Sequence, residues 1–149
     1  MAATAAEKRS IEVVRDFNDH VFNDRQYDRI GEYQSEDYVQ HGPFPDGEVH
    51  GNDESLETLQ LFHSAFSDVH AEVVFRFSDG EYVCTRYHYT GTHDGPLMEI
   101  APTDVECEVP GTVVNRIEDG KIAEAWVSPD LMGLLQQVGV VPEMAEISA

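Results

Sequence analysis

Arg86 and His88 lie two residues apart in a stretch with the alternation of a β-strand, so both side chains point to the same face. On a concave face, this pair would offer a cationic hydrogen-bond donor and a titratable ring beside a bound carbonyl compound. Proton transfer next to a carbonyl group needs such a combination. Tyr87 and Tyr89 point to the other face. Alternation does not say which face is concave, so a polar outer face or a dimer contact explains Arg86 and His88 equally well.

Four further residues are candidates for contacts with a bound small molecule. His63 and Phe66 belong to the apolar stripe of a helix predicted from Asn52, where a histidine is more often packed in a core or pocket wall than catalytic. His41 precedes a proline-rich loop that could roof a cavity, either as a pocket group or as a loop anchor. Trp126 lies near the end of the last predicted strand, where core packing is expected and a share in a pocket wall is the alternative.

No motif in the chain indicates a metal or a cofactor. The seven histidines are scattered, without a helical H-x-x-x-H pair, and Cys84 and Cys107 lack the spacing of metal ligands. Phosphate-binding, dinucleotide-binding and nucleophile-elbow motifs are absent from the sequence. We therefore expect no metal and no cofactor, and two buried free thiols.

The composition is strongly acidic, with 9 Lys and Arg against 29 Asp and Glu and a net charge of −20. Such a surface repels phosphate backbones and anionic headgroups, so we expect neither a nucleic-acid nor a membrane partner. The sequence shows no signal-peptide pattern and no apolar run of about 18 residues, which predicts a cytoplasmic location. A charge this large exceeds what solubility needs, and we interpret it as adaptation to concentrated salt in a halophile.

Helical periodicity predicts four helices. They cover about residues 5–22 and 26–34, a segment from Asn52 to Asp68, and 131–138. For the last helix, Ser128 is the predicted N-cap and Pro129 the first helical residue, and Gly139 ends it.

From residue 70 onward the apolar period becomes two, which is typical of strands. Strands are expected at about 70–77, 82–92, 105–117 and 122–127, with a short edge strand at 38–40 before the loop at 41–47. Val73, Phe75 and Phe77 form the apolar face of the first of these. Asp-Gly pairs predict tight hairpin turns at 78–80 and 118–121. Helices followed by hairpin-linked strands predict an α+β fold with an antiparallel sheet, as one domain over 1–149 with a core at about 8–141 and short flexible tails.

Several segments in order resemble a known family. They are Gly91-Thr92-His93-Asp94-Gly95, Pro102-Thr103, the run Arg116–Trp126, Asp130, and Leu134–Gly139, together with the end of the Asn52–Asp68 helix. This set resembles the SnoaL-like polyketide cyclases, or ester cyclases, of the nuclear transport factor two-like superfamily. The resemblance spans roughly residues 8–141.

The resemblance implies a curved antiparallel sheet wrapped by three to four helices into a cone with an apolar internal pocket. It also implies a homodimer formed through the sheet, and ring closure by aldol condensation without a metal or cofactor. In the family, an acid/base aspartate directly follows the position of Trp126, and a helping histidine lies on the preceding strand. Here those positions are Val127 and Val113. Valine cannot transfer a proton.

Two functions stay open on this evidence. One is cofactor-free cyclase or isomerase chemistry on a small, largely apolar carbonyl compound, with Asp130 or His88 as acid/base and Arg86 and His41 stabilising negative charge. Asp130 matches a position common in the family, although it also suits the first turn of a helix. The alternative is a non-catalytic ligand-binding or dimeric accessory protein. A third reaction, epoxide hydrolysis, needs two carboxylates bridged by an arginine, which the sequence does not assemble.

Overall fold

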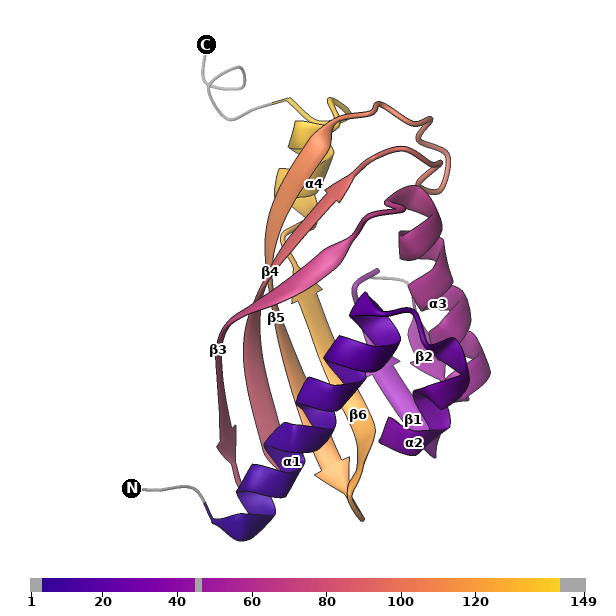
Figure 1. Ribbon diagram of the computed structural model, residues 1–149. Helices are drawn as coiled ribbons and strands as arrows, with labels where there is room; N and C mark the ends of the chain where they lie inside the picture. The colour runs from indigo at the N-terminus through magenta and orange to yellow at the C-terminus, as the bar shows by residue number, and fades with distance from the viewer. Residues whose placement is uncertain (1–3, 45–46, 143–149) are drawn as a thin grey trace.

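A six-stranded sheet forms the body of the protein in the computed structural model, which describes residues 4–44 and 47–142 (Figure 1). The strands follow the spatial order β2-β1-β6-β5-β4-β3. Their bounds are β1 Gln34–His41, β2 Glu48–His50, β3 His70–Asp79, β4 Tyr82–Thr92, β5 Glu106–Glu118 and β6 Lys121–Pro129. The sheet is curved and unclosed, as the fold prediction required.

The α+β fold class is confirmed, with one difference in strand direction. Every pairing is antiparallel except that of β1 with β6, which is parallel. Parallel neighbours need a long connection, and here α3 and the β3–β5 strands supply it. The short strand β2 was not predicted, and β1 is longer than the expected edge strand at 38–40.

Local turn chemistry forms the hairpin between β5 and β6. Glu118 pairs with Lys121, and the two residues between them have positive φ angles, 51° for Asp119 and 77° for Gly120. Two consecutive positive φ values define the type I′ turn, whose twist matches that of the strands it joins. The predicted tight turn is therefore confirmed.

Four α-helices accompany the sheet within the described residues, in the order of the prediction but with different bounds. They are α1 Ala5–Asp16, α2 Ile30–Tyr33, α3 Gly51–Ala65 and α4 Leu131–Gln137. A π-helical turn, Phe17–Asn23, extends α1, and a 3₁₀ turn, Tyr27–Arg29, precedes α2. Thus the predicted helix at 26–34 is mostly a 3₁₀ turn and a single α-turn, and α3 ends before Asp68.

The start of α4 differs from the prediction. Asp130, and not Ser128, is its N-cap, because β6 continues through Pro129. Pro129 pairs with Gly111 of β5, and the Asp130 N–H donates to the Pro110 carbonyl oxygen at 2.9 Å. Ser128 and Pro129, which local capping rules assign to the helix, thus belong to strand β6.

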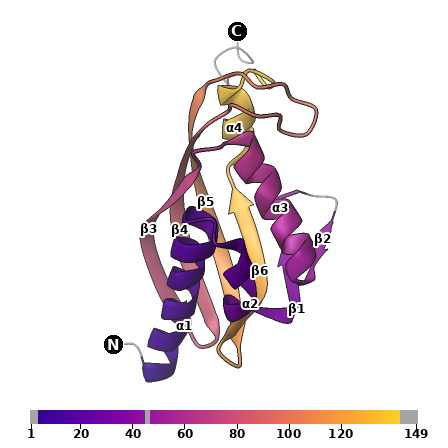
Figure 2. The same ribbon diagram turned by 45° about the vertical axis from the view of Figure 1, so that its right-hand side comes forward.

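Two apolar clusters lie at opposite ends of the concave face. One contains Phe66, Val109 and Leu134 and packs beneath α4 and the end of α3. The other contains Val14 of α1 and Ile122 of β6, beside the β5–β6 hairpin. In Figure 2, α1 crosses the part of the sheet near that hairpin, and α4 lies beside the opposite end of the sheet, where it packs on β5. The space between the clusters is where a cavity can form.

Strand β3 does not present the single apolar face that was predicted. Its register shifts between Val73 and Phe75, so Val73 pairs with Tyr87 and Phe75 with Arg86. A bulge of this kind moves the residues after it to the other face. Phe75 and Phe77 are 53% and 54% exposed, and their rings stack with centroids 6.3 Å apart. The outer face of the sheet therefore carries an apolar patch.

No helix in the described segments combines the length and apolar character needed to cross a bilayer. The assignment of residues 1–149 to one domain stays a prediction. The predicted tails fall partly on 1–3 and 143–149, and part of the predicted 41–47 loop on 45–46, which lie outside the described residues.

Candidate functional site

A cavity of about 190 Å³ lies between the concave face of the sheet and the helices. One water needs about 10–15 Å³ on this scale, so an organic molecule of several atoms can be enclosed. Toward α4 its walls are mainly apolar and include Phe22, Phe62, Phe66, Val109, Leu131 and Leu134. Elsewhere they include polar but uncharged side chains, among them Gln34, Tyr38, Gln40, Ser55 and Asn115.

Strand β4 turns its tyrosines, and not Arg86 and His88, toward the cavity. Tyr87 and Tyr89 line the cavity, so alternation puts Arg86 and His88 on the outer face. There the Arg86 guanidinium donates to Thr112 Oγ1 at 3.0 Å, and His88 pairs with Pro110 of β5. The structure thus settles the choice of face that alternation left open, and it does not bring this pair to the cavity.

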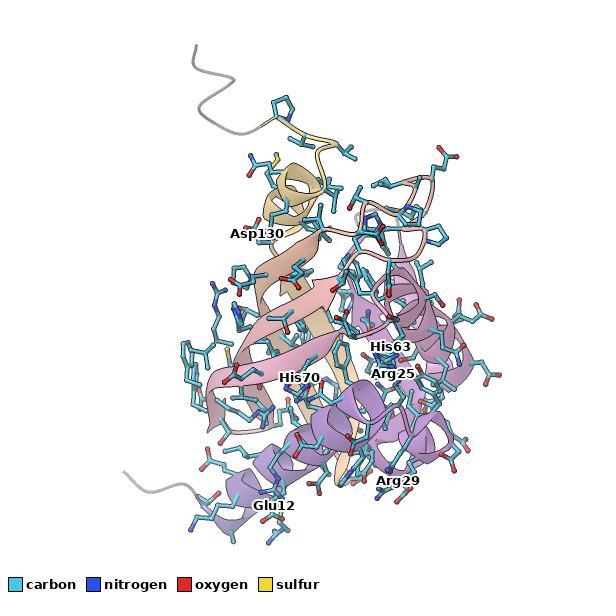
Figure 3. All side chains as sticks on the ribbon, turned by 45° about the horizontal axis from the view of Figure 1, so that its top comes forward. Glu12, Arg25, Arg29, His63, His70 and Asp130 are labelled. Atoms are coloured by element: carbon cyan, nitrogen blue, oxygen red, sulfur yellow. The ribbon has the colours of Figure 1, made fainter. Side chains whose placement is uncertain are left out.

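Asp130 lies at the first turn of α4 (Figure 3). Its Oδ1 accepts a hydrogen bond from the Gly133 backbone N–H at 2.9 Å, and the residue is exposed. This is the hydrogen bond that an N-cap carboxylate usually forms. Asp130 is not among the residues that line the cavity. Its predicted acid/base role stays a prediction.

His41 and Trp126 belong to the outer face beside a second groove of about 700 Å³. The two rings stack with centroids 5.3 Å apart. His41 Nε2 lies 2.6 Å from Glu124 Oε2, and the other carboxylate oxygen, Glu124 Oε1, accepts from Arg116 Nε at 3.0 Å. The hydrogen bond with His41, and then Arg116, lowers the pKa of Glu124. Both predicted contact residues therefore take part in an outer network and do not line the cavity.

His63 and Phe66 of the predicted helical stripe have different surroundings. Phe66, directly after α3, lines the cavity, and its contact with a bound compound stays a prediction. His63 is 7% exposed and lies behind the wall, where its Nδ1 is 2.6 Å from the Tyr27 hydroxyl and its ring meets the edge of Phe22. Figure 3 shows it beside Arg25. Burial, and then the charge of Arg25, lower the pKa of His63 to about 4.

This neutral histidine predicts a pH-dependent stability. An unfolded histidine has a pKa near 6.5, so between pH 6.5 and 4 the unfolded chain binds more protons than the folded one. Lowering the pH through this window should remove stability from the wild type, by at most about 1.4 kcal/mol per pH unit. His63→Gln lacks the titrating ring. The urea-unfolding free energy of the wild type minus that of the variant should therefore decrease as the pH falls. A value that does not change with pH would contradict a neutral His63.

Val113 and Val127 both line the cavity and face each other across β5 and β6. The family resemblance described above implies a helping histidine and an acid/base aspartate at these two positions. Side chains opposite each other on antiparallel strands have Cβ atoms about 4.5–5.5 Å apart, so an aspartate and a histidine here could contact each other. The two positions implied for the acid/base pair therefore line the cavity in this chain, but both are occupied by valine, which has no titratable group.

Sequence reasoning missed the uncharged polar groups of the cavity. Gln34 was assigned to the end of a helix, and Asn115 to a strand without a known orientation. Tyr38 and Tyr89 were not proposed as site residues either. Burial raises the pKa of both tyrosines, and for Tyr89 the neighbouring Tyr87 adds to it, so both hydroxyls remain protonated donors. Alternation could have identified Asn115 only with knowledge of the concave face.

Residues 4–44 and 47–142 contain no group of three histidine, cysteine or acidic side chains arranged to hold a metal ion. Both cysteines are free thiols; Cys107 is buried and Cys84 half-buried. The cavity can thus exclude water from an apolar compound and offer neutral donors and acceptors to its oxygen atoms. It offers no carboxylate or imidazole among its described lining residues.

Known structures resemble this chain over nearly its whole length. A candidate SnoaL-like polyketide cyclase from Jannaschia sp. CCS1 superposes with a TM-score of 0.88 at 19% identity, covering 95% of this chain and 99% of its own. IdmH, a candidate polyketide cyclase from Streptomyces antibioticus, gives 0.76 at 27% identity, with 88% and 99% covered. AclR from Streptomyces galilaeus, a candidate hydroxylase, gives 0.82 at 23% identity, with 95% and 88% covered.

These structures share a fold but not one named reaction, in line with the rule that a fold does not define a function. No sequence among the curated proteins matches this chain. The family model of the SnoaL-like polyketide cyclases matches residues 12–138. This match covers most of the chain and nearly all the elements that enclose the cavity. The chain therefore belongs to the SnoaL-like polyketide cyclase family.

Proposed function

We propose that this chain binds a small, uncharged and largely apolar carbonyl compound in the cavity and promotes its cyclisation or isomerisation without a cofactor. The observation that carries the proposal is the lining, which combines apolar side chains with amides and hydroxyls and lacks ionised groups within the described residues. A charged ligand would lose its hydration there without gaining an ion pair. A neutral carbonyl compound loses much less hydration free energy on entering the cavity.

The proposed chemistry rests on enclosure and hydrogen bonding. Holding a flexible compound in a folded shape brings its reacting carbons together, which lowers the entropic part of the barrier. Protonated donors such as the Tyr89 hydroxyl can stabilise the negative charge that develops on a carbonyl oxygen when a neighbouring proton leaves. With Val113 and Val127 in the cavity wall, the described lining offers no base, so in this scheme the proton leaves to bulk solvent and the product regains one from it.

A second candidate is a non-catalytic ligand-binding protein. The same pair, Val113 and Val127, favours it, because general acid–base catalysis by a positioned side chain is worth about 10²–10⁴-fold in rate. The two candidates agree on what binds and differ on what happens to the bound compound.

1-Tetralone, a bicyclic aromatic ketone, tests both steps. Calorimetry should detect its binding to the wild type, whereas 1-naphthoate, a carboxylate of similar size, should not bind. In deuterated buffer, the bound ketone should exchange its α-protons at least about tenfold faster than the free ketone. Binding without faster exchange would favour the non-catalytic candidate. Failure of 1-tetralone to bind, or equal binding of the carboxylate, would overturn the proposal for the ligand.

The predicted acid/base residues can be tested in the same assay. Asp130→Asn retains a side chain able to cap α4, and His88→Ala removes a ring from the outer face. Because neither residue lines the cavity, we expect both variants to retain the wild-type exchange rate. A loss of about tenfold or more in either variant would restore the corresponding residue as an acid or base.

We infer that the outer face of the sheet mediates the homodimer implied by the family resemblance. Phe75, Phe77 and Tyr82 are 53%, 54% and 43% exposed, and neighbouring large apolar side chains on a surface usually mark a contact. Sedimentation of the wild type should give twice the mass of the chain, and Phe77→Glu should sediment as a monomer. A wild-type monomer, or an unchanged dimer in the variant, would contradict this assignment.

A further inference from the structure

Four amide side chains line the cavity, and only two of them are bonded to other described residues. The Asn18 amide donates to the Ala71 carbonyl oxygen at 3.4 Å. Gln40 is held at both ends, since its Oε1 accepts from the Tyr38 hydroxyl at 2.8 Å and its Nε2 donates to the Gly42 carbonyl oxygen at 3.0 Å. Gln34 and Asn115 remain.

Gln34 is the more deeply buried of the two remaining amides. It opens β1, is 2% exposed and lines the cavity, and its Oε1 is fully buried without a hydrogen-bond partner in the described part of the chain. A buried amide without a partner lowers stability, and such groups are rare in folded proteins. Buried polar atoms of Ser35, Asn52, His63 and His93 also lack a partner among the described residues, but of these five residues only Gln34 lines the cavity.

Asn115 lies on the other side of β6. It is 6% exposed, lines the cavity, and makes no side-chain hydrogen bond to another described residue. Its strand neighbours in register are Ala125 and Val83, which offer no polar side-chain atom. Unlike the Gln34 oxygen, its amide atoms are not fully buried, so they are accessible from the cavity.

Strand register places the two amides relative to each other. Gln34 pairs with Ile122 of β6, and Asn115 pairs with Ala125 of the same strand from the opposite side. Gln34 on β1 and Asn115 on β5 flank β6, so their backbones are two strand spacings, about 9.5 Å, apart. Each amide reaches the cavity from its own side of β6, and a ligand with two oxygen functions at opposite ends of a small ring system can bind both.

We propose that Gln34 and Asn115 form a neutral two-point subsite that selects ligands carrying two separated, uncharged oxygen functions on an apolar body. This inference rests on the proposed function and specifies its ligand. An amide offers both a donor and an acceptor, so each position can bind a carbonyl or a hydroxyl group. The subsite excludes pure hydrocarbons of the same shape, because they would leave both amides unpaired.

Three compounds with one carbon skeleton test the subsite: tetralin without oxygen, 1-tetralone with one oxygen, and 5-hydroxy-1-tetralone with one at each end. In the wild type, each added oxygen should tighten binding by about 3–10-fold, the usual net effect of one hydrogen bond. Gln34→Met and Asn115→Leu keep the side-chain size without the amide. Each variant should lose one of the two steps, and the double variant should bind all three compounds about equally.

A second readout separates ligand selection from a structural role. Gln34→Met removes a fully buried, unpaired amide oxygen, so it should raise the Tm of the ligand-free protein by about 3 °C. Asn115→Leu removes no hydrogen bond to a described residue, so it should not lower the Tm. A structural amide would do the opposite. As a matched control, Gln137→Met removes an amide that bonds Glu108 at both ends outside the cavity, and it should lower the Tm.

The outcomes distinguish this inference from the proposed function. If the wild type binds the ketones without preferring more oxygens, or the variants keep the preference, the subsite is wrong and the proposed ligand class stands. A lower Tm in Gln34→Met and Asn115→Leu would also overturn the subsite. If none of the three compounds binds the wild type, the proposed function itself fails, and the subsite fails with it.

Discussion

Val127→Asp is expected to accelerate the α-proton exchange of 1-tetralone by about 10²-fold over the wild type. Val127 is half-buried and lines the cavity. The family resemblance implies that the acid/base aspartate stands at this position, directly after Trp126. A carboxylate in this apolar wall would have a raised pKa, closer to neutral pH, which makes it a better base. Nuclear magnetic resonance of the ketone in deuterated buffer measures the rate directly.

Val127→Asn is the matched control, because it has the shape of the aspartate without its basicity. A rate in Val127→Asp that equals that of Val127→Asn, with 1-tetralone still bound, would show that this position does not reach the α-carbon. Adding Val113→His should raise the rate further, since residue 113 faces residue 127 across the strand pair. If the double variant gains no more than Val127→Asp, the two positions do not cooperate in this cavity.

Local chemistry explains which parts of the fold could be predicted. Asp119-Gly120 can adopt two positive φ angles, so this hairpin follows from two residues. The amphipathic pattern of α1 and the stripe of α3 likewise depend on neighbours three and four positions away. The ends of these elements could not be predicted equally well. Asp130 caps α4 only because strand pairing extends through Pro129, a contact with the distant Gly111.

The site was harder to predict than the fold because its geometry depends on curvature. Alternation separates Arg86 and His88 from Tyr87 and Tyr89, but the concave face is decided by the packing of α1, α3 and α4 on the whole sheet. The sequence offers charged and aromatic residues as candidates, whereas the cavity is lined by amides, a residue type that is usually found at protein surfaces. Gln34 could not be recognised from its type, only from its burial without a partner.

The net charge of −20 predicts that this fold depends on salt. At low ionic strength the acidic surface repels itself, and at 1 M salt the screening length falls to about 3 Å, which confines repulsion to nearest neighbours. We therefore expect the Tm to rise on the order of 10 °C between dilute buffer and molar KCl, followed by circular dichroism. Full folding in dilute buffer, unchanged by KCl, would contradict adaptation to concentrated salt.

A charge variant separates screening from general salt effects. Glu12, Glu57 and Glu99 are exposed and form no ion pair with other described residues, and Figure 3 shows Glu12 on the outside of α1. Replacing all three with lysine changes the net charge from −20 to −14. If repulsion is the cause, this variant should be more stable than the wild type in dilute buffer, and its Tm should rise less with KCl. An equal rise in both proteins would instead assign the stabilisation to salting-out of apolar surface, which acts regardless of charge.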